Sequence, residues 1–156
     1  MFPGRSPANP PCLQPDGMAY FVEKCSFDGI SEDTSKALLC SVETSTLCTY
    51  RRHWKRFATW FNSEGHRGNL NPSIICNYLL HMCNKSTSTS ALNSIRSAIS
   101  FFTLDKLSLS EAPSIKKLFK YFYKIKPLKP RYSTFWPVSQ LLEFLKTWHP
   151  MASLSL

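Results

Sequence analysis

The sequence is poor in glycine and in carboxylates, and it lacks the short motifs of common enzymes. Five glycines in 156 residues favour helices over a turn-rich all-β design. Only ten carboxylates are present, six of them in the first 44 residues, which argues against a metal-dependent nuclease. There is no G-x-S-x-G motif and no glycine-rich phosphate loop. We therefore expect no catalytic residue, no cofactor and no bound metal.

The spacing of the six cysteines matches neither a zinc site nor a redox motif. No two of them are arranged as C-x-x-C, and no histidine pair has zinc-finger spacing, so reduced thiols are the better interpretation than disulfides or zinc. No apolar run approaches the roughly 20 residues that span a bilayer. Residues 1–17 carry prolines where a signal peptide would be apolar. We expect an intracellular protein, nuclear if eukaryotic, with no membrane partner.

What the sequence does contain is basic charge in one part of the chain. Residues 1–44 hold three basic and six acidic side chains, whereas residues 45–156 hold sixteen basic and four acidic ones. The 21 aromatic residues and the hydrophobic fraction of 43% are sufficient for a buried core. A folded segment with this charge excess indicates a polyanionic partner, the alternative being a merely soluble basic surface.

Apolar residues recur at spacings of three and four in several segments, which predicts an all-α fold. We expect helices over residues 31–40, 45–64 and 114–124, two more starting near Asn71 and within 86–90, and another over 139–147. A small bundle of four to five helices would have one core containing Trp54, Phe57, Leu92, Ile95 and Ile99. The predicted organisation is a flexible tail (1–30), a helical domain (31–126), and a basic, proline-containing linker with one further helix (127–156).

Three polar surfaces follow from these helices. The second predicted helix carries a cluster of cations beside its aromatic stripe: Arg51, Arg52, Lys55 and Arg56. The fourth presents a face of short polar side chains with a single charge: Asn93, Arg96, Ser97 and Ser100. The stretch from 116 to 131 contains seven cations and no acid: Lys116, Lys117, Lys120, Lys124, Lys126, Lys129 and Arg131. The two cationic surfaces suit a phosphate backbone, and the face of short side chains suits base edges and sugar–phosphate oxygens. Each could also be an ordinary solvated face.

The order of several short motifs resembles one family. Ser45-Thr46 followed by Tyr50, Trp54, Phe57 and Trp60 resembles the second helix of the core-binding domain of tyrosine recombinases, especially those of DIRS-type retrotransposons. Ser88-Thr89 with the run from Ile95 to Ser100 is similar to a later helix of that domain. Residues 126–132 and Trp136-Pro137-Val138 resemble its link to the catalytic domain, although relatives tend to have an acidic residue at the position of Pro137. The resemblance covers residues 30–156.

This resemblance implies a SAM-like helical bundle that closes on double-stranded DNA together with a catalytic domain. The second and fourth helices of such a bundle lie against the major groove, and other recombinase protomers are partners. The catalytic arginines, lysine, histidines and tyrosine of the family have no matching positions here, so the chain would correspond to a non-enzymatic part, ending in a truncated start of the catalytic domain. The candidate DNA-binding residues are Thr46, Arg51, Arg52, Lys55, Arg56, Ser88, Thr89, Asn93, Arg96, Ser97, Lys116, Lys117, Lys120, Lys126, Lys129 and Arg131.

Two other interpretations fit the same residues. The chain could be a catalysis-free DNA-binding protein derived from a mobile element. It could instead be a helical protein-interaction module, whose basic amphipathic helix near residues 114–124 meets acidic partners or a membrane surface.

Overall fold

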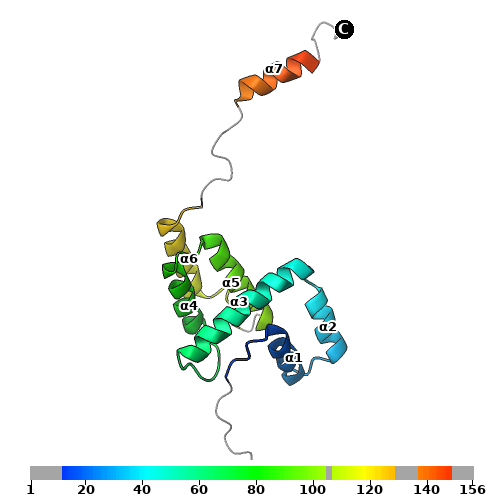
Figure 1. The fold of residues 1–156 in the computed structure, drawn as a ribbon, viewed down its shortest axis with the longest axis vertical. Helices are drawn as coiled ribbons and strands as arrows, with labels where there is room; N and C mark the ends of the chain where they lie inside the picture. Colours follow the sequence, from blue (N-terminus) through cyan, green and yellow to red (C-terminus); the bar gives the residue numbers. More distant parts are fainter. Residues whose placement is uncertain (1–11, 105–106, 129–136, 149–156) are drawn as a thin grey trace, which may run out of the picture.

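The computed structural model describes residues 12–104, 107–128 and 137–148, and every regular element within these ranges is an α-helix (Figure 1). The all-α prediction is therefore confirmed for this part of the chain. The helices, in chain order, are α1 (Gly17–Phe27), α2 (Glu32–Cys40), α3 (Thr44–Ser63), α4 (Pro72–Asn84), α5 (Thr89–Phe102), α6 (Pro113–Ile125) and α7 (Val138–Trp148).

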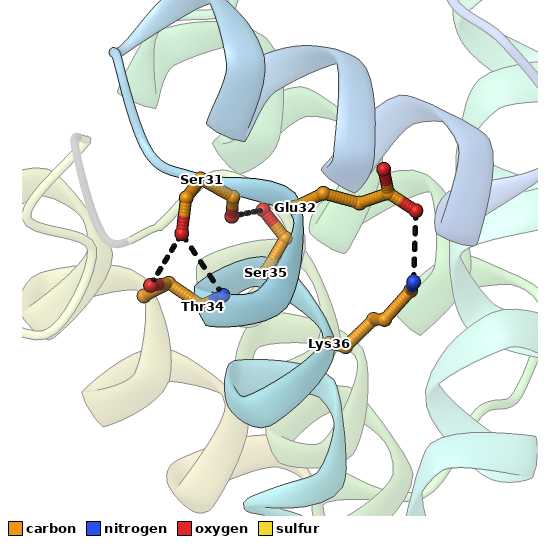
Figure 2. A network of polar contacts seen from close by, with 5 residues as sticks. All are labelled: Ser31, Glu32, Thr34, Ser35 and Lys36. Atoms are coloured by element: carbon orange, nitrogen blue, oxygen red, sulfur yellow. Dashed lines mark hydrogen bonds and ion pairs between the residues drawn. The ribbon is translucent and has the colours of Figure 1, made fainter.

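Helix α2 begins where its sequence predicts, because the Ser31 side chain caps one of its free N-terminal amide groups. The Ser31 hydroxyl accepts a hydrogen bond from the Thr34 backbone N–H at 3.3 Å, and the Ser35 hydroxyl donates to the Ser31 carbonyl at 2.9 Å (Figure 2). Lys36 pairs with Glu32 at 2.8 Å, one turn apart on an exposed face (Figure 2). Such a cap stabilises a helix by about 1 kcal/mol.

The start of α3 differs from the prediction of a cap at Ser45. The Leu47 N–H donates to the Glu43 carbonyl at 2.9 Å, so helical bonding begins two residues earlier, and the Glu43 side chain makes no capping hydrogen bond. The predicted end is confirmed: Gly65 follows the last turn with φ +70°, a conformation that favours glycine. Helix α3 thus leaves the hydroxyl of Ser45 on its surface rather than in a cap.

The core lies between α3 and α5, which make the most extensive helix–helix contact in the structure. Helix α5 also contacts α1, α4 and α6, and Figure 1 shows α4 and α6 on one side of the α3–α5 pair and α1 and α2 on the other. The five predicted core residues belong to one cluster and are each at most 1% exposed, which confirms that prediction: Trp54, Phe57, Leu92, Ile95 and Ile99. One pair of helices therefore carries both the core and two of the predicted polar surfaces.

The prediction of a flexible tail through residue 30 is wrong for residues 12–30. Helix α1 buries Phe21 and Cys25. It packs so closely that a side chain at Gly17 would collide with the rings of Phe102 and Trp54. The packed unit therefore contains six helices instead of four to five. The apolar spacing at residues 18, 21, 22 and 25 indicates this helix. The many prolines that precede these residues favour a tail instead.

A short extended segment that precedes α1 in the sequence lies against α3. The Leu13 N–H donates to the Asn62 side chain and the Leu13 carbonyl accepts from it, both at 2.9 Å. The Trp54 indole N–H donates to the Gln14 carbonyl at 3.0 Å. These bonds satisfy partly buried polar groups on both partners, and they join the first described residues to a helix that contributes Trp54, Phe57 and Phe61 to the core.

The predicted final helix is confirmed as α7, whose described side chains, residues 138–147, are all exposed. The predicted linker falls partly on residues 129–136, so Lys129 and Arg131 lie outside the described residues. Cys25 and Cys83 are buried, and none of the six cysteines, all of them in the described ranges, forms a disulfide. None of the helices in the described ranges has the length and apolar character that crossing a membrane requires.

Candidate nucleic-acid interface

The pairing of α3 with α5 brings two separately predicted polar surfaces together. Between the two helices lies an open hollow of about 570 Å³. Among the described residues that line it, Arg96 is the one with a charge, and none is acidic. The lining residues are Ser45, Thr46, Thr49 and Tyr50 from α3, with Ser90, Asn93, Ser94, Arg96 and Ser97 from α5. Thr46 therefore lies beside Asn93, Arg96 and Ser97, as a joint interface requires.

Beside this hollow, α3 presents an uninterrupted polar stripe. Ser45, Thr49, Arg52 and Arg56 are spaced by four, three and four residues, so they share the helix face opposite Trp54 and Phe61. Arg52 and Arg56 are exposed, and within the described residues neither forms an ion pair. Two arginines at this spacing repel each other unless anions approach them, so the stripe is a suitable surface for phosphates.

Arg51 differs from Arg52 because an acid from the segment before α1 approaches it. The Asp16 carboxylate lies 3.8 Å from the Arg51 guanidinium and also accepts from the Met18 N–H at the start of α1. Asp16, Arg51, Arg52 and Lys55 line a second hollow of about 480 Å³. The pair is exposed and adds little to stability, yet it reduces the positive charge that Arg51 presents to a ligand.

Two residues that the resemblance nominated for DNA contact are used inside the fold instead. Thr89 is 3% exposed, and its hydroxyl donates to the Lys126 carbonyl at 3.1 Å. The Lys126 ammonium in turn donates to the carbonyls of Cys83 and Thr87, at 3.0 and 3.3 Å. The carbonyl groups at the C-terminal end of α4 and in the turn that follows carry partial negative charge and attract a cation, which explains this placement. We therefore remove Thr89 and Lys126 from the candidate interface.

Ser88 is exposed, but its hydroxyl also has a structural partner. It accepts from the Ala91 N–H at 3.2 Å and so caps α5. This bond agrees with the prediction that α5 starts in the run of hydroxyl residues from 86 to 90. Any contact of Ser88 with a ligand would compete with the cap.

On α5, the two longest polar side chains of the hollow each contact an aromatic residue of α6. The Arg96 guanidinium carbon lies 4.8 Å from the centroid of the Phe119 ring. The Asn93 amide donates to the Tyr123 hydroxyl at 3.4 Å, while the Asn93 carbonyl oxygen is enclosed and has no hydrogen-bond partner within the described residues. Both side chains are therefore held by contacts that the sequence pattern did not indicate.

Helix α6 displays fewer available cations than its sequence suggests. Lys116 pairs with Glu111 at 2.9 Å. The remaining lysines of the helix are spaced by three and four residues on the face opposite its buried residues Ile115, Phe119 and Phe122, and they line neither hollow: Lys117, Lys120 and Lys124. They form a separate basic stripe of α6.

His53 is a residue of this region that the sequence did not indicate as important. It is half-buried, and burial, followed by the nearby charges of Arg56 and Arg52, lowers its pKa below the ordinary value of 6.5. Its Nδ1 atom is enclosed without a partner in the described residues. Tyr78 is buried against the same helix, and burial raises its pKa to about 12 although the charge of Arg56 acts in the opposite direction. Because the pKa of His53 is lowered, its imidazole is mostly neutral at pH 7 and adds no positive charge beside Arg52 and Arg56.

In the described ranges, no group of three histidine, cysteine, aspartate or glutamate side chains could hold a metal ion. No family model matches the chain, and no curated protein and no solved structure matches it either.

Proposed function

We propose that this chain is a DNA-binding module with the SAM-like bundle of a tyrosine-recombinase core-binding domain, and that α3 and α5 face a DNA duplex. The observation that carries the proposal is the acid-free hollow between α3 and α5, lined by hydroxyl and amide groups and flanked by Arg52 and Arg56. The family resemblance assigned DNA contact to these same two helices.

The geometry suits a duplex for two physical reasons. Cations on a rigid helix can replace condensed counterions along the phosphate backbone, and the released ions favour binding. The side chains of α5 in the hollow are mostly serines, so a groove edge can approach the helix without displacing long groups. The module binds the duplex and leaves strand cleavage to a catalytic domain, because the family's catalytic residues have no counterparts in this chain. Other recombinase protomers on the DNA, and a nuclear location in a eukaryote, belong to the same proposal.

A fluorescence-anisotropy titration of a labelled duplex at several salt concentrations tests the proposal. We expect weak binding that falls steeply with salt, with no cleavage and no covalent adduct. A control variant is Lys24→Ala/Arg67→Ala, which removes two positive charges from residues that line neither of the two hollows. This variant should bind like the wild type, and an absence of salt-dependent binding by the wild type would contradict the proposal.

The basic stripe of α6 supports a second candidate function. Lys117, Lys120 and Lys124 share one exposed face with Tyr121, which is 49% exposed, an arrangement that also suits an anionic membrane surface or an acidic protein. Sedimentation with vesicles containing anionic lipid separates the candidates. Retention on vesicles that is abolished by Lys117→Ala/Lys120→Ala, without retention on DNA, would favour the second.

A further inference from the structure

The polar face of α5 is supported from beneath by α6. Phe119 is 5% exposed and lies under Arg96, and Tyr123, one turn further along α6, contacts Asn93. Two residues three apart on α5 thus meet two residues four apart on α6. The contacts set the direction of both α5 side chains before any ligand arrives.

The stack on Phe119 leaves one part of Arg96 free for recognition. A guanidinium over an aromatic ring is held by cation–π attraction, and its N–H groups remain available at the edge of the plane. Arg96 pairs with no acid within the described residues, and it lines both the hollow between α3 and α5 and a neighbouring one of about 330 Å³. A side chain held in this way loses little conformational entropy when it binds.

The contact with Tyr123 makes Asn93, unlike Arg96, unavailable for recognition. A bidentate contact with adenine needs both the amide and the carbonyl oxygen of an asparagine. In this structure the Asn93 amide is bound to Tyr123 and its carbonyl oxygen is enclosed. Arg96, by contrast, can offer two parallel N–H groups, which match the O6 and N7 acceptors of guanine.

We propose that Phe119 and Tyr123 are positioning residues for base recognition, and that Arg96, held on Phe119, selects guanine in the major groove of the bound duplex. This inference rests on the proposed function and adds to it the base that the site distinguishes and the part of the fold that sets this preference. Asn93, held by Tyr123, is prevented from adding a preference for adenine.

Selection of bound sequences from a randomised duplex pool tests the specificity. The wild type should enrich guanine at one position by roughly tenfold, which is within the range for one bidentate pair. Arg96→Ala and Phe119→Leu should both reduce this preference to near unity, and Phe119→Leu should leave the salt slope unchanged. Phe119→Tyr, which keeps the ring, should retain the preference, and Tyr123→Phe should release Asn93 and raise the enrichment of adenine. A guanine preference that survives Arg96→Ala or Phe119→Leu would overturn the inference.

A measurement without DNA separates this inference from the proposed function. In the free protein, the Arg96 Nε–H resonance should show restricted motion and a ring-current shift, and both should disappear in Phe119→Leu. A mobile Arg96 side chain in the wild type overturns the positioning role whether or not DNA binds. If the wild type retains no duplex at low salt, the proposed function and the guanine preference both fail. If Phe119→Leu does not fold, as judged by thermal melting, Arg96→Ala and Phe119→Tyr decide the result.

Discussion

Helices α3 and α6 are both rich in cations, but the fold uses these cations differently. On α3, Arg52 and Arg56 remain exposed next to an acid-free hollow. At α6, Lys116 is paired with Glu111, and Lys126 just beyond its end donates to the main-chain carbonyls of Cys83, in the last turn of α4, and of Thr87. The stretch from 116 to 131 has the higher density of positive charge in the sequence, yet α3 offers the better-defined surface. Charge density in a sequence therefore gives only the number of basic side chains. Acids and carbonyl groups within the fold decide how many of them are available to bind a ligand.

The largest expected effect comes from removing the side chain that anchors α3. Trp54 is fully buried, and its indole N–H has a partner at the Gln14 carbonyl. We expect Trp54→Ala to lower the free energy of unfolding by about 3–5 kcal/mol, because it opens a cavity and leaves that carbonyl without its donor. Denaturant titration measures this, with Phe27→Ala as the control, since Phe27 is 84% exposed. Equal destabilisation by the two variants would contradict the packing described for α3.

A matched pair of double variants tests whether the phosphate contacts come from α3 or from α6. Arg52→Ala/Arg56→Ala should reduce the slope of log K against log salt by roughly two units, because each phosphate contact contributes about 0.9. Lys117→Ala/Lys120→Ala removes the same charge from the α6 stripe and should reduce the slope by less than one unit. The two slopes come from anisotropy titrations at fixed pH. A larger change for the α6 pair would assign the phosphate contacts to α6 instead.

A Lys126 variant tests whether this cation supports the fold or contacts phosphates. Lys126→Ala removes two hydrogen bonds from a cation to the carbonyls of Cys83 and Thr87, and we expect a loss of about 1–3 kcal/mol in stability. The salt slope of DNA binding should stay unchanged. Lys124→Ala, which removes an exposed lysine from the last turn of α6, should leave stability within about 0.5 kcal/mol of the wild type. A changed salt slope with unchanged stability would make Lys126 a phosphate contact after all.

The smallest expected effect is a pH dependence caused by His53. Its pKa is lower in the folded chain than the ordinary value of 6.5, so below that pH the unfolded chain binds more protons than the folded one. Its contribution to stability is therefore complete above about pH 6.5 and is lost as the pH falls through the lowered pKa. Unfolding titrations between pH 7 and 5 should show a smaller decrease for His53→Gln than for the wild type. Identical curves for the two proteins would exclude this role of His53.

Most of the fold could be predicted from local sequence signals. Ser31, Asn71 and Ser88 cap α2, α4 and α5 with their own side chains, as expected from residues whose oxygen can accept a main-chain N–H. Helix α1 was missed because the prolines before Asp16 suggested a tail, although Phe21 and Cys25 already had helical spacing. The start of α3 was misplaced because Ser45 looks like a cap, whereas the helix begins at Thr44.

The sequence by itself determined which residues are apolar, which are charged and which faces of the helices they occupy, because helical periodicity depends only on order along the chain. Only the tertiary structure decided which of these faces became neighbours. Packing of α3 against α5 brought Thr46 to Arg96, and packing of α6 placed Phe119 beneath Arg96 and directed Lys126 to the end of α4. The partners in each case lie between about 20 and 50 positions apart, and no local rule relates residues so distant. Thr89 has the side chain of a surface contact and became buried for the same reason, since the end of α6 covers it.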